Sequence, residues 1–235
     1  MNFLKIKKHF LIFLLIVIST LSWAQGNLQY IDDKPLHFGF SLGINSMDFG
    51  IKPSLQSIDG KIYQVDVSTL KPGFSVGIVS DLRLNRYLNL RFTPTLHFGE
   101  RQLNYSHNFG TSDSLTITSV PVYLPLLLKY SAERKGNFRP YLLWGAGAYI
   151  DLGTNKENPM LLKPLDFYTE FGVGCDLYFS FFKLAPELKF AIGFNDMLVP
   201  LDQRDAGVIS PENKKFTNAL SKLTSRMLTL SFNFE

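Results

Sequence analysis

The side chains that could carry covalent or metal chemistry are few, and none stands in a recognised catalytic pattern. After the first two dozen residues the histidines are His37, His97 and His107, whose spacing fits no metal site. The chain has no G-x-S-x-G, H-E-x-x-H or C-x-x-C sequence, and Cys175 is its single cysteine. We therefore expect no metal, no cofactor and no enzymatic activity. The alternative is a His–Ser–Asp site that folding assembles from distant segments.

Charged residues offer a second kind of chemistry, because they recur at the polar positions of otherwise apolar segments. Where such segments enclose an interior, the charges are buried and have to pair with one another. We therefore expect a structural ion-pair network, and a path for protons or ions is the alternative. The predicted members are Asp81, Arg83, Arg91, Lys129, Asp151, Glu170, Asp176, Glu187 and Lys189.

The segments that carry these charges alternate between apolar and polar residues. In LHFGFSLGIN, residues 36–45, every second residue from Leu36 to Ile44 is large and apolar, which is the period of a β-strand. The same pattern recurs in residues 73–84, 87–100, 116–131, 140–152, 166–179, 183–194 and 226–235. We expect about eight strands, each near the length that crosses a bilayer at a tilt.

The apolar faces of these strands are expected to meet lipid. Their opposite faces are rich in Gly, Ser, Thr and Tyr, whereas a sheet packed on a protein core would expose many Lys and Glu to water. Glycine pairs such as Gly145 with Gly147 and Gly172 with Gly174 would leave room for packing inside a narrow barrel. The predicted fold is an all-β, antiparallel transmembrane outer-membrane β-barrel, with a β-sandwich and a soluble lipocalin-like barrel as alternatives.

The connections between the strands alternate in length, which also favours the barrel. Short connections fall at residues 84–87, 132–138 and 181–183, and long polar ones at 51–71, 101–115, 153–165 and 195–224. Short turns at one end and long loops at the other are typical of outer-membrane barrels. Strand pairing should break or bulge at the prolines, because these lack a backbone donor. They are Pro94, Pro121, Pro125 and Pro186.

The first 24 residues have the layout of a secretory signal. A basic start is followed by an apolar run over residues 10–18 and then by Ser22-Trp23-Ala24, a small-x-small cleavage site. We expect a signal peptide over residues 1–24, a barrel domain over 25–235 and a location in the outer membrane. Three of the 24 basic residues lie in the signal, so the rest is nearly neutral against 20 acids, which argues against nucleic acid as a partner.

The longest connection, residues 195–224, is the predicted docking site for a partner protein. It mixes apolar residues with charges, as an interface does, and 213–223 could form a short amphipathic helix or a disordered surface loop. The residues predicted to dock the partner are Met197, Leu198, Val199, Arg204, Val208, Ile209, Phe216 and Leu220.

Three segments carry a resemblance to a known family. DDKPLHFGFSLGINSMDFGIK (32–52) resembles the first strand of the PorT family, also called SprT, of the type IX secretion and gliding-motility system. SVPVYLPLLLKYSAER (119–134) and FRPYLLWGAGAYIDL (138–152) resemble the middle hairpin of this family and of the wider outer-membrane β-barrel superfamily. The resemblance implies a role in protein export, with outer-membrane lipid and other secretion proteins as partners and no small-molecule substrate. A structural or porin-like barrel without a secretion role is the alternative.

Overall fold

The computed structural model of the protein describes residues 27–28, 30–54, 57–58, 61–67, 71–107, 112–153, 160–201 and 214–235. The predicted signal, residues 1–24, lies outside this part, so its cleavage stays a prediction. In order along the chain the elements are η2 (Ile31–Asp33), β1 (Leu36–Pro53), β2 (Ser57–Ile58), β3 (Lys61–Val67), β4 (Pro72–Arg83), β5 (Leu88–Phe92), β6 (Thr95–His107), β7 (Ser112–Ser119), β8 (Pro121–Ser131), β9 (Phe138–Asp151), β10 (Leu165–Tyr178), β11 (Lys183–Gly193), α2 (Lys214–Asn218) and β12 (Leu220–Phe234).

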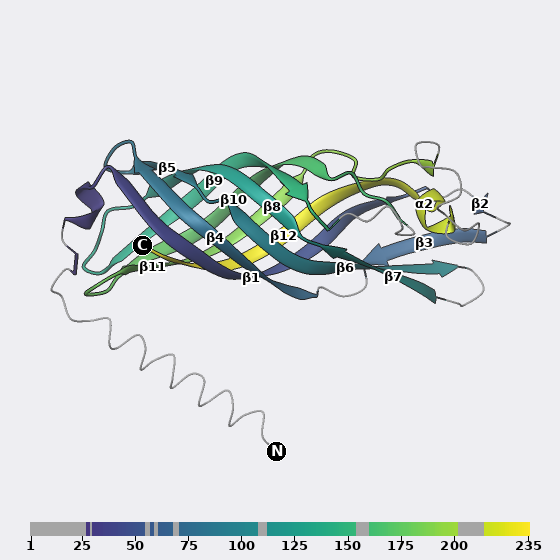
Figure 1. The fold of residues 1–235 in the computed structure, drawn as a ribbon, viewed down its shortest axis with the longest axis horizontal. Helices are drawn as coiled ribbons and strands as arrows, with labels where there is room; N and C mark the ends of the chain where they lie inside the picture. Colours follow the sequence, from purple (N-terminus) through teal and green to yellow (C-terminus); the bar gives the residue numbers. More distant parts are fainter. Residues whose placement is uncertain are drawn as a thin grey trace, which may run out of the picture.

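The strands close into an antiparallel ring, which confirms the predicted barrel (Figure 1). β1 pairs with β12 on one side and with β4 on the other, and the pairing continues through β11, β10, β9 and β8. Three pairs of labelled strands each form one longer strand of the ring. β3 and β4 are one such pair, because both run along β6, and β5 and β6 are another, because both lie between β4 and β8. In the third pair, β7 leads into β8. Counted in this way, the described part of the ring has about eight strands.

Three of the four strand prolines interrupt the pairing as expected. β8 pairs with β5 as far as Leu126 and with β6 from Tyr123. Pro125 lies in the gap between these two pairings, and Pro94 lies in the matching gap between β5 and β6. Grouping the two prolines at one gap limits the loss of ladder hydrogen bonds to one place. Pro186 is missing from the β10–β11 pairing, although it pairs with β12. Pro121 starts β8 directly after a break in the strand.

Both ends of the described chain lie at one end of the barrel, with the short turns. These turns span residues 84–87, 132–137 and 179–182, close to the predicted positions. Figure 1 shows η2 and the C-terminus at this end, and α2, β2, β3 and β7 at the opposite end. We name the two ends the short-turn end and the long-loop end. In outer-membrane barrels the short turns face the periplasm.

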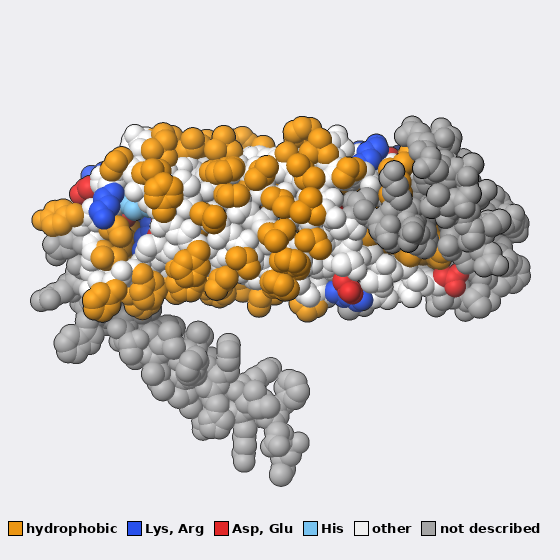
Figure 2. Space-filling view, viewed as in Figure 1, with side chains coloured by type: hydrophobic (Ala, Val, Ile, Leu, Met, Phe, Trp, Pro, Cys, Tyr) orange, Lys and Arg blue, Asp and Glu red, His pale blue; other side chains and the backbone are white. Residues whose placement is uncertain are grey.

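In the membrane-spanning part the apolar side chains point outward. On β8 the side chain of Leu126 is 52% exposed, whereas that of its neighbour Leu127 is completely buried. The outward positions Leu42, Val76 and Leu188 are exposed in the same way. Figure 2 shows hydrophobic side chains over the short-turn end and middle of one face. This surface suits lipid, and it would be unstable in water.

The face polarity reverses toward the long-loop end, where the sequence predicts loops. Residues 101–107 belong to β6 and 112–115 to β7, and the inward side chains Leu103, Leu115 and Ile117 are buried while the outward Ser114 and Thr116 are exposed. The prediction of a polar loop over 101–115 is therefore wrong for the described residues. The long connection 51–71 likewise contains the end of β1 and the strands β2 and β3.

Candidate functional site: the filled lumen

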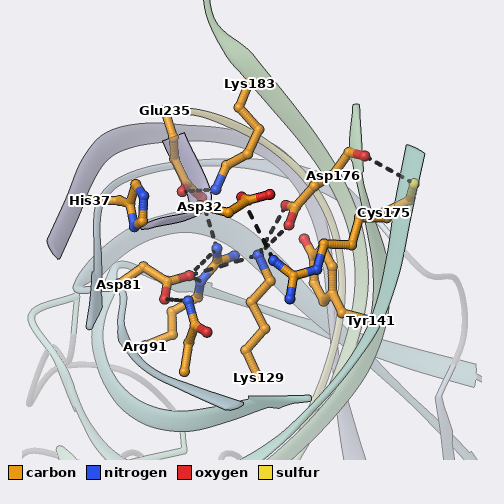
Figure 3. A network of polar contacts seen from close by, with 12 residues as sticks. Asp32, His37, Asp81, Arg91, Lys129, Tyr141, Cys175, Asp176, Lys183 and Glu235 are labelled. Atoms are coloured by element: carbon orange, nitrogen blue, oxygen red, sulfur yellow. Dashed lines mark hydrogen bonds and ion pairs between the residues drawn. The ribbon is translucent and has the colours of Figure 1, made fainter. Parts of the chain in front are cut away.

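A charge network crosses the lumen near the short-turn end (Figure 3). Its centre is Arg91 on β5, whose guanidinium donates to both flanking acids: to Asp81 Oδ2 from Nε at 2.9 Å, and to Glu187 from Nη1. The same guanidinium donates from Nη2 to Glu235 Oε1 at 2.7 Å. Asp81 also accepts a bond from the Asn89 amide at 2.6 Å. Arg91, Asp81 and Glu187 are 2% exposed or less, so these pairs are shielded from water.

A second set of pairs joins residues of β8, β9, β10 and β11 to this centre. Lys129 on β8 donates to both oxygens of Asp176 on β10, at 2.9 and 2.8 Å. The Nζ atom of Lys183 on β11 lies 2.6 Å from Glu235 Oε2. Tyr141 on β9 donates its hydroxyl to Glu187 at 2.6 Å, and its ring lies 4.0 Å from Lys129 Nζ. We use the name charge network for Asp81, Asn89, Arg91, Lys129, Tyr141, Asp176, Lys183, Glu187 and Glu235.

Seven of the nine predicted charges meet in or beside this network. Lys189 Nζ lies 3.5 Å from Glu170 Oε1 and 3.8 Å from Glu187 Oε2, so this pair extends the network toward the middle of the barrel. Arg83 is a correction: it lies at the rim, partly exposed, and pairs with Asp33 at 3.0 Å. Asp151 is buried toward the long-loop end, where its carboxylate accepts hydrogen bonds from the backbone of Val120 and Gly153.

The sequence prediction missed four members of the network. Asn89, Tyr141 and Lys183 all occupy inward positions of alternating segments, so the period-two pattern contained them. Glu235 continues the inward series of Thr229, Ser231 and Asn233 by one more step, although it follows the last strand. The alternation therefore locates inward residues, but it does not show which of them reach one another across the lumen.

Glycines on the inward face make room for the large side chains of the lumen, as predicted. A Cβ atom on Gly174 would lie 2.5 Å from the ring of Tyr141. A Cβ atom on Gly147 would lie 2.8 Å from the hydroxyl of Tyr168. Both contacts are too short for a real side chain, so these positions need glycine for packing.

Aromatic side chains fill the lumen beyond the charge network. We call His97, Tyr123, Tyr149 and Tyr168 the aromatic layer; all four are at least 96% buried. The Tyr123 ring is 4.7 Å from Tyr149, 4.7 Å from Tyr168 and 4.9 Å from His97, between ring centroids. Next along the axis, the buried Arg101 guanidinium lies 4.7 Å from the ring of Phe49 and donates to Ser119 and Ser225.

A hydrophobic cluster closes the long-loop end, and it contains half of the predicted docking residues. Met197, Leu198, Phe216 and Leu220 are 8% exposed or less and pack in one cluster with residues of β1, β6, β7 and β12. Phe216 belongs to α2, the short helix that was one of two alternatives for residues 213–223. These four side chains point inward, which corrects the expectation that they form an exposed docking surface. Val199 is partly buried, and Arg204, Val208 and Ile209 lie outside the described residues.

Other sites for chemistry are sparse in the described part of the chain. His37 and His97 are buried inward as expected, whereas the side chain of His107 lies outside the described residues. Within residues 27–235, apart from the gaps given above, no three His, Cys, Asp or Glu side chains are grouped to hold a metal ion. The same residues include no helix that is both long and apolar enough to cross a membrane.

The comparisons with known proteins agree with the geometry at the level of the fold. The family model described as outer membrane protein beta-barrel domain matches residues 23–199. No curated protein matches the chain. The matched region covers most of the chain, from before β1 to residue 199, which follows β11. The chain therefore belongs to the outer membrane protein beta-barrel domain family.

Proposed function

We propose that this barrel is an outer-membrane component of a protein secretion apparatus, and that it works through contacts with partner proteins outside the lipid bilayer. The observation that supports contact-based action is the filled lumen. The charge network, the aromatic layer and the hydrophobic cluster follow one another along the barrel axis. A barrel of about eight strands has room for side chains but not for an aqueous channel as well.

The secretion role rests on the resemblance of residues 32–52, 119–134 and 138–152 to the PorT family of the type IX secretion and gliding-motility system. In this proposal the protein has secretion proteins and lipid as partners, and it has no catalytic activity. Passive pore function is the weaker candidate, because side chains of the charge network and of the aromatic layer would have to move before ions could pass.

Deletion of the gene is the direct test of the secretion role. We expect the deletion strain to lose secreted proteins from the medium and to stop spreading on surfaces, while complementation with the intact gene restores both. Normal secretion and spreading in the deletion strain would refute the proposal and leave a structural barrel as the better account.

Complementation with lumen variants separates contact-based action from transport through the barrel. If the lumen is structural, Glu187→Gln should reduce secretion only in proportion to the amount of folded barrel. Glu133→Gln, a change at the exposed rim, is the matched control. Loss of secretion at an unchanged level of folded Glu187→Gln barrel would instead favour a proton or transport role.

A further inference from the structure

One edge of β7 has no neighbouring strand among the described residues. β7 pairs with β6 along its length, and within the described part of the chain it pairs with no other strand. Its continuation β8 is paired on both sides, with β5 and β6 on one side and with β9 on the other. Figure 1 shows β6 and β7 running together toward the long-loop end. On the side where β9 would continue, β7 is therefore an edge strand.

Asp151 ends the β9 ladder beside β7. The carbonyl of Val120 still accepts a hydrogen bond from the backbone of Leu152 at 3.1 Å. The backbone N–H of Val120, however, donates to Asp151 Oδ1 at 3.0 Å, and not to the carbonyl of Leu152 as in a complete antiparallel pair. The same oxygen accepts from the backbone of Gly153 at 2.9 Å. The carboxylate therefore takes the place of the next ladder acceptor, and β9 does not follow β7.

The direction of the backbone groups of β7 follows from Val120. The register of β6 against β7 continues without a shift against β8, so the period of two passes through Val120. Because Val120 turns its N–H and C=O toward β9, the N–H and C=O groups of Ser114, Thr116 and Thr118 face the same side. These three residues therefore offer three donors and three acceptors along the free edge.

The sequence of β7 leaves this edge suited to pairing. Edge strands that avoid pairing carry lysines, prolines or bulges, whereas residues 114–119, SLTITS, contain no charge and no proline, and their ladder with β6 has no bulge. The outward Thr116 is exposed, while the inward Leu115 and Ile117 are 8% and 4% exposed and belong to the hydrophobic cluster. A strand added here would present small polar residues outward and apolar residues toward that cluster.

Two occupants from the protein itself do not meet these requirements. Strands of such barrels tilt by about 35–45°, so the β7 strands of two copies that face each other in one membrane would cross at roughly twice that angle, whereas paired strands differ by about 20–25°. Residues 154–159, TNKENP, contain no Leu, Ile, Val or aromatic residue for the inward face. A segment of another protein is free of both restrictions.

From the free edge and its sequence, we propose that an extended segment of a partner protein adds to β7 as a further β-strand, outside the outer membrane. The segment alternates apolar and small polar residues, and it accepts from and donates to the backbone of Ser114, Thr116 and Thr118. This inference deepens the proposed function and rests on its claim of partner contacts, because it names the surface where the partner binds.

Photo-cross-linking in living cells tests the proposal. Benzoylphenylalanine is placed at Ser114, whose side chain is exposed beside the free edge, and Thr116→Pro is compared with Thr116→Val. Proline removes the N–H that faces the free edge and leaves the β6 ladder complete, whereas valine keeps the N–H and suits a strand. We expect the adduct with a partner protein to fall by about tenfold in Thr116→Pro relative to Thr116→Val, as loss of a ladder hydrogen bond implies.

Controls separate strand addition from other contacts. Benzoylphenylalanine at Asn104, an outward position of β6 with β3 on one side and β7 on the other, should not give this adduct. Thr118→Pro acts at the same edge and should reduce the adduct like Thr116→Pro, and yields are counted per folded barrel from heat-modified gel mobility. Equal yields in the proline and valine variants, no adduct from Ser114, or an adduct of two copies of this chain would each overturn the proposal.

The secretion role is tested separately from the strand site. Mass spectrometry of the adduct identifies the cross-linked segment, which should alternate apolar and small polar residues. Normal secretion in the deletion strain, together with an adduct that Thr116→Pro removes, would refute the secretion role and still support the strand site. Loss of secretion in the deletion strain, with equal adducts in both Thr116 variants, would support the secretion role and overturn the strand site.

Discussion

At the scale of single residues, the lumen depends on arginine at one position. Arg91 makes simultaneous contacts with Asp81, Glu187 and Glu235, which lie on different strands of the ring or at its last residue. The planar guanidinium presents several donors in a fixed fork, whereas a lysine ammonium would act as a single point charge. Because these groups are buried, the network is stable only when every charge has its partner.

Glu187→Gln tests this dependence on complete pairing. The change removes the negative charge that faces Arg91 and Lys189 in a buried site, so we expect a loss of stability on the order of 3 kcal/mol. Glu133→Gln removes a carboxylate from an exposed arginine pair and should cost less than about 1 kcal/mol. Urea titration monitored by heat-modified gel mobility measures both. Equal losses in the two variants would show that the buried network contributes no special stability.

At the scale of the strands, the sequence predicts faces better than it predicts ends. Alternation identifies the outward Leu126 and the inward Lys129 because lipid and lumen impose opposite requirements on neighbouring residues. Outside the bilayer those requirements reverse, so the inward Leu103 and Leu115 stand among polar residues. A search for strands with outward apolar faces therefore interprets the hairpin of β6 and β7 as a loop. The pairing of Arg91 with Glu235 is beyond such a pattern, because it depends on how the ring closes.

The orientation of β8 can be tested with two adjacent spin labels. In a Cys175→Ala background, a label at Leu126 should be accessible to oxygen dissolved in the lipid, because this side chain points outward. A label at Leu127, one residue away, should be inaccessible, because its side chain points into the lumen. Electron paramagnetic resonance of the reconstituted protein measures this accessibility. Similar values at both positions would mean that the register of β8 is wrong.

At the scale of the whole molecule, the barrel combines two environments along its axis. The membrane-spanning part has a polar interior and an apolar surface, and the part beyond it has an apolar interior that includes Met197 and Phe216. The same two residues were predicted to dock a partner. The sequence could not separate the two roles, because an apolar residue in a long connection gives no indication of whether it points outward or into a core. Met197 and Phe216 are therefore not available for the partner contact of the proposed function.

Processing of the chain provides a separate test at this scale. The Ser22-Trp23-Ala24 pattern predicts cleavage after Ala24, so the mature protein should begin at Gln25. Intact mass and N-terminal sequencing of protein purified from outer membranes measure the processed end. Mature protein that retains residues 1–24 would refute the predicted signal.

Ion conductance in a planar lipid bilayer tests the central claim, that the lumen is closed by its own side chains, most directly. The purified, folded barrel should insert without giving stepwise currents, because the charge network, the aromatic layer and the hydrophobic cluster occupy the lumen in series. Insertion can be verified independently by protease protection of the reconstituted protein. Stable, stepwise currents from the intact barrel would contradict this account and establish an open pore.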